Sequence, residues 1–367
     1  MGILRLILAT IVVLAHTQLF GYVGGLSSAQ IAVQMFFIIS GFLISYILTD
    51  LKSYSKVSHF YFNRFVRLYP AYFFICSLTL FFYFFEITEN SAFFETYKSL
   101  PANALIYLFF TNATLLFQDL SFFLAIENSN LVFSSNYLAS SNLIPDGLLI
   151  GPAWTLGIEI SFYILAPFII KKKKILFFFL SLSLSIFLVN RYINHLGHYD
   201  PWTYRFFPTQ LSLFLLGAIS HQFLKPLYNY IFAKKLIASS NIFTFIFISF
   251  LLIYFYICSD LNMHRLAQGG ILYGCLLFML PFLFTFNSKY RFDRYIGNLS
   301  YPVYLVHELV MKIGYFIGYL KQSEPGIDSL ENAIIVLIMS IVFSIIFNHT
   351  IESRVSKLRA RYRKKII

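Results

Sequence analysis

Two residues that can carry a charge lie within the first apolar stretch of the sequence, Arg5 and His16. They are eleven positions apart, and at about 100° per residue eleven steps of a helix return to nearly the same face, roughly 16 Å along the axis. Ionisable residues are costly inside a membrane and mark functional sites there, so the aligned pair is interpreted as functional. For Arg5 alone, a cationic flank of the span is the better interpretation.

Two further apolar stretches contain ionisable residues. Glu159 lies in mid-run with no Lys or Arg within one turn, and a buried carboxylate must pair, be protonated or face a polar cavity. We therefore interpret Glu159 as functional. His307 has Tyr304 one turn before it and Ser300 a further turn back, all on one helical face. A ligand-binding histidine and a core histidine bonded to a tyrosine are equally compatible with that pattern.

Two other motifs suit ligand binding by shape or charge. Arg64 and Arg67 are one turn apart on one face, and two guanidinium forks suit a phosphate-bearing ligand. Arginines are also common at the cytoplasmic ends of membrane spans, so this signal is weak by itself. Ser40 and Gly41 interrupt an apolar run with small residues, which let either a narrow ligand or a neighbouring helix come close.

The composition of the chain indicates where these residues are held. Of its 367 residues, 58% are hydrophobic and only 12% are charged, about half the charged fraction of a soluble domain. The net charge of +12 comes from Lys and Arg clusters beside apolar runs, so it indicates membrane topology and not nucleic-acid binding. The three cysteines form neither a disulfide framework nor a metal-ligand pattern.

The apolar runs predict an all-α, polytopic membrane bundle of about ten helices. The predicted spans are 3–20, 31–49, 69–86, 148–170, 175–190, 208–224, 242–258, 267–286, 297–319 and 332–350. Every second connection is basic, which predicts that both termini are cytoplasmic. Residues 1–350 then form one transmembrane domain and 351–367 a basic tail, and the first span is retained because it lacks a cleavage site.

One apolar segment, 102–117, tests this topology. The connections on both sides of it are poor in Lys and Arg. If 102–117 crossed the membrane, a cytoplasmic loop without any basic residue would follow it. The segment is therefore predicted to stay at the outer face, with 118–147 as an outer loop.

Five motifs in this order resemble the membrane acyltransferase family 3, the bacterial O-acyltransferases of surface glycans. They are the Arg5–His16 pair, Phe-Phe-Ile-Ile-Ser-Gly-Phe at 36–42, Arg-Phe-Val-Arg-Leu-Tyr-Pro at 64–70, Trp-Thr-Leu-Gly-Ile-Glu-Ile-Ser-Phe-Tyr at 154–163, and Leu-Ser-Tyr-Pro-Val-Tyr-Leu-Val-His at 299–307. One departure is Gly2, where the family often has an acidic residue three positions before the arginine. The chain resembles the stand-alone form, without a fused esterase-like domain.

The resemblance implies a multi-pass O-acyltransferase, usually an O-acetyltransferase, of the bacterial plasma (inner) membrane. Acyl-CoA, usually acetyl-CoA, would be the cytoplasmic donor, with no metal, and the acceptor would be a lipid-linked or exported glycan. His16 would be the general base, assisted by Glu159 and Arg5. Arg64, Arg67, Ser40 and Gly41 would contact the donor. Substrate or oxyanion contacts would come from His307, Ser300, Tyr304 and Trp154. The alternative from a different class is a transporter or flippase for a glycan lipid, with Arg5, Glu159 and His307 along its path.

Overall fold

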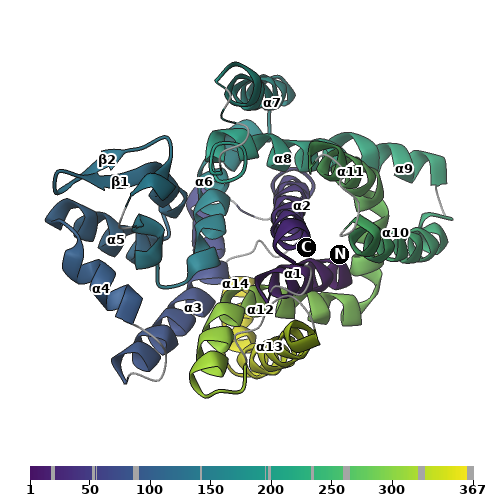
Figure 1. The fold of residues 1–367 in the computed structure, drawn as a ribbon. Coiled ribbons are helices and arrows are strands. Elements are labelled where there is room, and N and C mark those ends of the chain that lie inside the picture. The colour runs from purple at the N-terminus through teal and green to yellow at the C-terminus, as the bar shows by residue number, and fades with distance from the viewer. Residues whose placement is uncertain are drawn as a thin grey trace. The chain divides into compact units, whose positions relative to one another are not determined.

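A computed structural model describes residues 1–17, 21–51, 54, 56–85, 91–140, 143–194, 196, 200–232, 235–258, 265–320 and 327–361, and most of them are helical (Figure 1). The helices are α1 (Gly2–His16), α2 (Gly21–Thr49), α3 (Val57–Phe84), α4 (Ser91–Ser99), α5 (Ala102–Thr114), α6 (Trp154–Ile169), α7 (Lys173–Leu188), α8 (Phe207–Ile219), α9 (Lys225–Phe232), α10 (Leu236–Cys258), α11 (Arg265–Lys289), α12 (Arg291–Phe316), α13 (Ile327–Phe347) and α14 (Ser353–Arg361). One antiparallel hairpin joins β1 (Leu124–Glu127) to β2 (Asn130–Phe133).

The helical lengths confirm an all-α polytopic membrane protein. Within the described residues, seven helices are long and apolar enough to cross a membrane. Each of them corresponds to one of the ten predicted spans. The other three predicted spans correspond to α1, which has 15 residues, to α8 with its π-helical continuation Ser220–Leu224, and to the more polar α12.

The segment 102–117 forms a helix that is shorter than the hydrocarbon core of a membrane is thick. α5 has 13 residues, so it is about 20 Å long against a hydrocarbon core of about 30 Å. It ends where Leu115 and Phe117 adopt positive φ angles of 60° and 62°, which a continuing helix does not allow. A 3₁₀ helix (Gln118–Phe123) and the β-hairpin follow, within the stretch that the sequence predicts as an outer loop.

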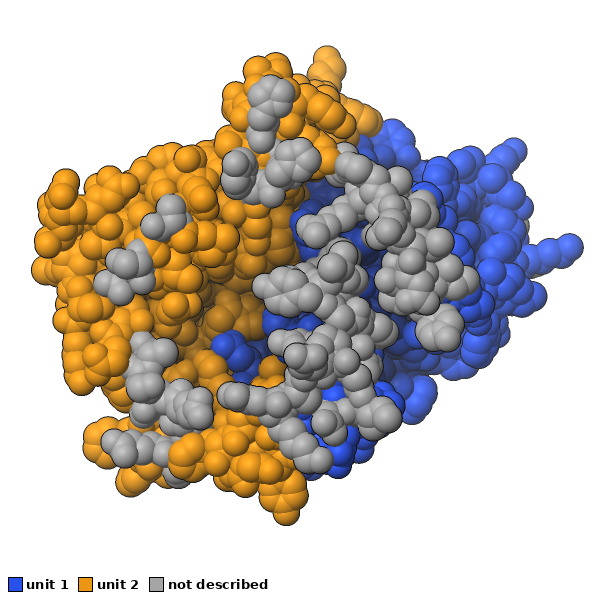
Figure 2. Space-filling model, viewed as in Figure 1, with its two compact units in different colours: residues 1–67, 213–310, 321–367 blue, residues 68–212, 311–320 orange. Residues whose placement is uncertain are grey.

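The chain divides into two compact units (Figure 2), and three of the four boundaries between them along the sequence fall inside α3, α8 and α12. Unit 1 comprises residues 1–67, 213–310 and 321–367, and unit 2 comprises residues 68–212 and 311–320. In unit 1, α1 packs against α2 and α13, and α10 packs against α11. In unit 2, the buried residues Leu100, Ala104, Leu108, Ile144 and Leu148 form a small core under α5.

Gly41 of α2 allows close helix packing. A Cβ at this position would lie 1.8 Å from the carbonyl oxygen of Phe214, and a Cβ on Gly217 would lie 1.9 Å from the carbonyl oxygen of Ile38. The two glycines therefore let the backbones of α2 and α8 touch. Of the two interpretations of the small residues at 40–41, the structure favours helix packing for Gly41 over ligand contact.

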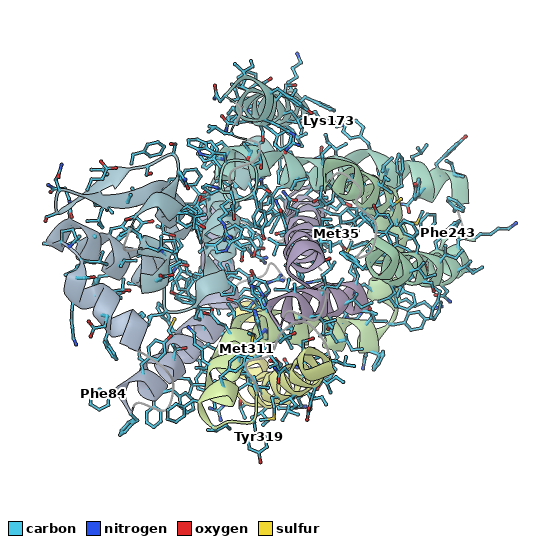
Figure 3. All side chains as sticks on the ribbon, in the orientation of Figure 1. Met35, Phe84, Lys173, Phe243, Met311 and Tyr319 are labelled. Atoms are coloured by element: carbon cyan, nitrogen blue, oxygen red, sulfur yellow. The ribbon has the colours of Figure 1, made fainter. Side chains whose placement is uncertain are left out.

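The surface of the helices is apolar, as a membrane requires. Phe84 and Tyr319 of unit 2 project away from the ribbon in Figure 3 and are largely exposed, whereas Met35 lies buried among the helices of unit 1.

Beyond α13 the chain continues as a π-helical turn (Asn348–Glu352) and as α14. Residues 351–361 of the predicted basic tail are thus helical, and 362–367 lie outside the described residues.

The predicted topology can be tested at the tip of the hairpin. Ser129 is exposed and lies in the β1–β2 turn. In a background in which Cys76, Cys258 and Cys275 are replaced by Ala, we expect Ser129→Cys to react with an impermeant thiol reagent added to intact cells. A cysteine at Lys357, exposed on α14, should react only after the membrane is opened. The reverse result would overturn the topology.

Candidate functional site

His16 and His307 are in direct contact within unit 1. His16 is the last residue of α1, and His307 lies in α12. Nε2 of His307 is 3.2 Å from Nδ1 of His16, and the two ring centroids are 5.0 Å apart. The histidine predicted as the general base and the histidine predicted to contact the substrate therefore form one hydrogen-bonded pair.

The backbone fixes the tautomer of both rings. Nδ1 of His16 is 2.9 Å from the carbonyl oxygen of Val12, and Nδ1 of His307 is 2.7 Å from the carbonyl oxygen of Tyr304. A carbonyl oxygen only accepts hydrogen bonds, so both Nδ1 atoms carry the proton. The single Nδ1–H proton of His16 is then shared between the carbonyl oxygen of Val12 and Nε2 of His307, and the lone pair of His16 is on its Nε2.

This arrangement suits His16 for proton transfer. Its ring is exposed while His307 is fully buried. When Nε2 of His16 takes a proton, Nδ1–H still points at the lone pair of neutral His307, which stabilises the imidazolium and holds the ring in place.

Tyr304 contributes its carbonyl oxygen to this pair, and its ring lies 6.0 Å from that of His307. The single hydroxyl proton of buried Ser300 is donated to the carbonyl oxygen of Gly297, within its own helix.

A cationic cavity of about 460 Å³ lies at the opposite end of α1 from His16. Four arginines line it, from α1, α3, α12 and α14, and its only acidic lining residue is Glu352. The arginines are Arg5, Arg67, Arg294 and Arg359. Arg5 and Arg67 were selected from the sequence, while Arg294 and Arg359 were not. The excess of guanidinium groups makes the cavity suited to an anionic ligand with several phosphates.

The structure separates the two arginines that the sequence pairs on one face. Arg67 lines the cavity, whereas the buried side chain of Arg64 donates from Nη2 to Oδ1 of Asn63 at 2.8 Å. The guanidinium of Arg64 also lies 5.7 Å from the centre of the Phe60 ring. The described geometry therefore gives Arg67 access to a ligand in the cavity and gives Arg64 a role in packing.

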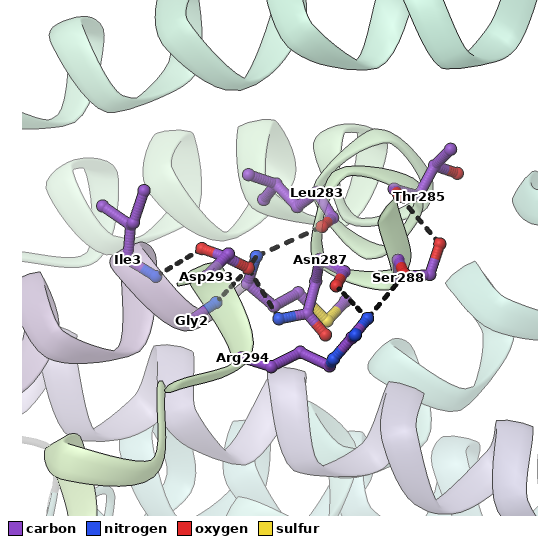
Figure 4. Close-up of polar contacts among 9 residues, drawn as sticks. Gly2, Ile3, Leu283, Thr285, Asn287, Ser288, Asp293 and Arg294 are labelled. Carbon is purple, nitrogen blue, oxygen red and sulfur yellow. Dashed lines mark hydrogen bonds and ion pairs between the residues drawn. The ribbon is translucent and has the colours of Figure 1, made fainter. Parts of the chain in front are cut away.

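A carboxylate from α12 caps the first turn of α1 (Figure 4). Asp293 accepts hydrogen bonds from the backbone N–H of Gly2 at 2.9 Å and of Ile3 at 2.8 Å, and its Oδ2 accepts from Asn287 at 2.6 Å. Arg294 next to it donates to the carbonyl oxygens of Asn287 and Ser288. An acidic side chain from α12 thus lies at the first turn of α1, where it satisfies open N–H groups of the helix end.

Gly2 itself is required by this contact. A Cβ on Gly2 would lie 1.6 Å from the carbonyl oxygen of Asp293. We expect Gly2→Ala to force α1 away from α12 and to destabilise the protein by about 1–3 kcal/mol, the usual cost of overpacking. The matched control is Gly270→Ala on α11, where a Cβ meets nothing within 4 Å. Thermal unfolding of the purified proteins measures both, and equal midpoints would contradict the close contact.

Glu159 and Trp154 belong to unit 2. Glu159 of α6 accepts a hydrogen bond from the hydroxyl of Tyr163, one turn further along the same helix. Trp154 begins α6 and lies in a cluster of aromatic rings with Phe122 and Tyr204. Pairing is one of the three options that the sequence leaves open for Glu159, and Tyr163 of the same helix is one partner.

A second histidine network was not expected from the sequence. The hydroxyl of Ser45 lies 3.0 Å from Nδ1 of His221, and Nε2 of His221 lies 3.2 Å from Oδ2 of Asp50. Lys225 donates to the same carboxylate oxygen at 2.6 Å. The order Ser–His–Asp is that of a nucleophilic triad, but Ser45 is fully buried and so cannot meet a substrate. The network joins the end of α2 to the π-helical turn after α8.

Asp119, in the 3₁₀ helix Gln118–Phe123, is a buried carboxylate. Burial, opposed by hydrogen bonds from three backbone N–H groups, raises its pKa from 3.8 to about 7. The folded state therefore holds a proton that the unfolded state loses above about pH 4, and this contribution to stability disappears as the pH rises through 7.

We expect the unfolding temperature to fall between about pH 4 and pH 7, and the loss of stability is at most about 4 kcal/mol for three pKa units. Asp119→Asn should flatten this dependence because an amide does not titrate. The control Glu127→Gln, at an exposed position of β1, should leave it unchanged. A profile that stays as steep in Asp119→Asn as in the wild type would remove Asp119 as its cause.

No group of three or more His, Cys, Asp or Glu side chains that could hold a metal is found among the described residues. The site consists of a histidine pair at one end of α1 and an arginine-lined cavity at the other. This layout can move a proton at His16 and bind phosphates about 16 Å away along the same helix.

Comparison with known proteins agrees with these motifs. The acyltransferase domain family matches residues 1–349. The chain is also 30% identical over 223 residues to an uncharacterised protein of Aquifex aeolicus, an alignment that covers 59% of this chain and 91% of that protein. No solved structure matches the chain. Because the family match extends over nearly the whole chain, this protein belongs to the membrane acyltransferase family 3.

Proposed function

We propose that this acyltransferase moves an acyl group, in the first instance acetyl, from cytoplasmic acyl-CoA to a hydroxyl of a cell-surface or exported glycan. The acceptor would be O-antigen, capsule or exopolysaccharide at the bacterial inner membrane. The observation that supports this proposal is that the two ends of α1 carry different groups. Its first turn lines an arginine-rich cavity, and its last residue is the exposed histidine of a hydrogen-bonded pair. An extended pantetheine arm has a length of the same order as that separation.

The chemistry follows from the tautomers. Nε2 of His16 takes the proton of the acceptor hydroxyl while its oxygen attacks the thioester carbonyl carbon. The carbon–sulfur bond then breaks, and the imidazolium returns the proton to the leaving thiolate. Direct transfer of this kind requires no Ser or Cys nucleophile. The arginines of the cavity hold the phosphates of the donor and so keep the thioester in place.

The experiment uses the purified full chain and acetyl-CoA labelled in the acetyl group. We expect slow hydrolysis without an acceptor and faster release of free CoA when the isolated surface glycan is added, with label recovered in the glycan. Mass spectrometry of surface glycans from a deletion strain should show the loss of the same ester. Glycan movement across vesicles without any thioester cleavage would instead identify a flippase.

A further inference from the structure

The only two tryptophans of the chain, Trp154 and Trp202, belong to two sets of aromatic rings in unit 2 that adjoin at the consecutive residues Phe122 and Phe123. The two sets together are called the aromatic group. Trp154 contacts Phe122 and Tyr204, with ring centroids 5.9 Å and 5.0 Å away. Trp202 contacts Phe123, the neighbour of Phe122, at 5.0 Å. The rings come from the predicted outer loop 118–147, the start of α6 and the turn 200–206, so the group lies at the predicted outer face.

Phe133 is the ring of this group that is open to a ligand. It ends β2, and 65% of it is exposed. One face stacks on Phe123 with the planes 13° apart, and Trp202 meets it at 6.0 Å and 74°. The indole N–H of Trp202 donates to the carbonyl oxygen of Ser135 at 3.0 Å, which fixes the tryptophan. The outer face of Phe133 is therefore a rigid aromatic surface.

The neighbours of Phe133 distinguish it from the lipid-facing phenylalanines. On α3, exposed rings such as Phe84 belong to an apolar run of 28 residues. Phe133 instead follows a hairpin whose tip contains Asn128, Ser129 and Asn130, and it precedes two serines. An aromatic face with a polar border suits a ring that has apolar C–H groups on its faces and hydroxyl groups at its edge. A pyranose has that chemistry.

Arg205 supplies hydrogen-bond donors from the turn that also carries Trp202. Its guanidinium carbon lies 4.0 Å from the centre of the Phe122 ring and 4.5 Å from that of Trp154. Its Nε donates to both carboxylate oxygens of Asp200, at 3.0 Å and 2.9 Å. Neither Nη1 nor Nη2 has a hydrogen bond to any residue that the structure describes. The side chain of Arg205 is 18% exposed and that of Asp200 is 41% exposed.

These groups can bind a sugar hydroxyl both as a hydrogen-bond acceptor and as a hydrogen-bond donor. The Nη groups of Arg205 donate to the hydroxyl oxygen, and the carboxylate of Asp200 accepts its proton. The turn that carries them is held in place from α8, since Gln210 donates to the carbonyl oxygen of Thr203 at 2.9 Å. The donor, the acceptor and the aromatic face are thus preorganised before any ligand arrives.

We propose that Phe133, Trp202, Asp200 and Arg205 form a sugar-binding site for a pyranose ring of the acceptor glycan. The identification of the ligand as acceptor rests on the proposed acyl transfer, but binding itself does not. Both tryptophans lie in or beside the site, so their fluorescence reports occupancy without any acyl donor.

The experiment titrates the full chain with methyl pyranosides of glucose, galactose, mannose and rhamnose. Phosphocholine nanodiscs replace glycoside detergents, whose sugar headgroups would compete. We expect a saturable change in tryptophan emission with at least one sugar, with a Kd of about 1 mM or weaker, as befits a single ring. Phe133→Ala and Arg205→Gln should each raise this Kd at least tenfold, while Phe133→Tyr retains binding. The control Phe84→Ala should bind as the wild type does.

Three outcomes would overturn the site: no saturable response to any of the sugars, unchanged binding in Phe133→Ala, or quenching of Trp202 by lipids brominated in their acyl chains. The quenching is measured in a Trp154→Phe background and would place the surface in the bilayer. Hydrolysis of acetyl-CoA by the same preparation tests the proposed enzyme separately, so failure of the sugar site leaves that result intact.

Discussion

Replacing His16 by Ala should lower acyl transfer by about 10²–10⁴ while the protein remains folded and inserted, because the acceptor hydroxyl then loses its general base. His16 is exposed at the end of α1, so its truncation leaves no cavity in the core. The affinity for acyl-CoA should be retained, since the arginine-lined cavity is at the other end of the helix. The transfer rate of the wild type should rise with pH as the imidazolium loses its proton. The residual rate of His16→Ala should not show this rise with pH. Normal glycan acylation in a His16→Ala strain at the usual protein level would refute this role.

His307 provides the control that distinguishes a base from a positioning residue. Its Nε2 accepts the Nδ1–H of His16, so His307→Ala should reduce kcat by less than His16→Ala does. His307→Gln can present an amide oxygen to the same N–H and should recover part of the loss. A larger loss of kcat in His307→Ala than in His16→Ala, with both variants folded, would exchange the two roles.

Much of the helical frame could be predicted from the sequence, because seven of the predicted spans are apolar runs long enough to identify a membrane-crossing helix. The placement of Arg5 and His16 at opposite ends of one helix could also be predicted, from the helical rise per residue. The contact of His16 with His307 could not be predicted, because these residues are 291 positions apart and helical periodicity does not determine which helix faces which. For the same reason Arg294 and Arg359 were not selected as lining residues of the cavity. Their positions in basic connections resemble those of any arginine that marks topology.

Other details depend on single atoms and are not contained in a residue pattern. Ser300 shares a face with His307, yet its hydroxyl proton is donated within its own helix. Gly41 interrupts an apolar run, and only the position of Phe214 shows that a neighbouring backbone occupies the space. Gly2 departs from the family pattern, and Asp293, which caps the first turn of α1, is 291 positions away from it in the sequence. In each case the sequence offers a residue type, and the partner that decides its role lies on another element or another turn.

Replacing Arg67 by Ala should raise the KM for acetyl-CoA roughly tenfold to a hundredfold, with little change in kcat. Loss of one charge-assisted hydrogen bond to phosphate costs about 1.5–3 kcal/mol, which corresponds to that range. The matched control is Arg354→Ala on α14, where an exposed arginine that does not line the cavity is removed. Arg64→Ala should change the unfolding temperature more than the KM, because that guanidinium is buried against Asn63.

Acetyl-pantetheine separates phosphate binding from every other effect of these substitutions. It carries the thioester but no phosphate, so the wild type should use it with a high KM, and Arg67→Ala should leave that KM unchanged. The ratio of the KM for acetyl-pantetheine to the KM for acetyl-CoA should then be smaller in Arg67→Ala than in the wild type. In Arg354→Ala this ratio should be unchanged. Raised salt should weaken the use of acetyl-CoA in the wild type more than in Arg67→Ala, because the lost contact is ionic. An unchanged KM for acetyl-CoA in Arg67→Ala would exclude Arg67 from the donor site and require the phosphates to bind elsewhere.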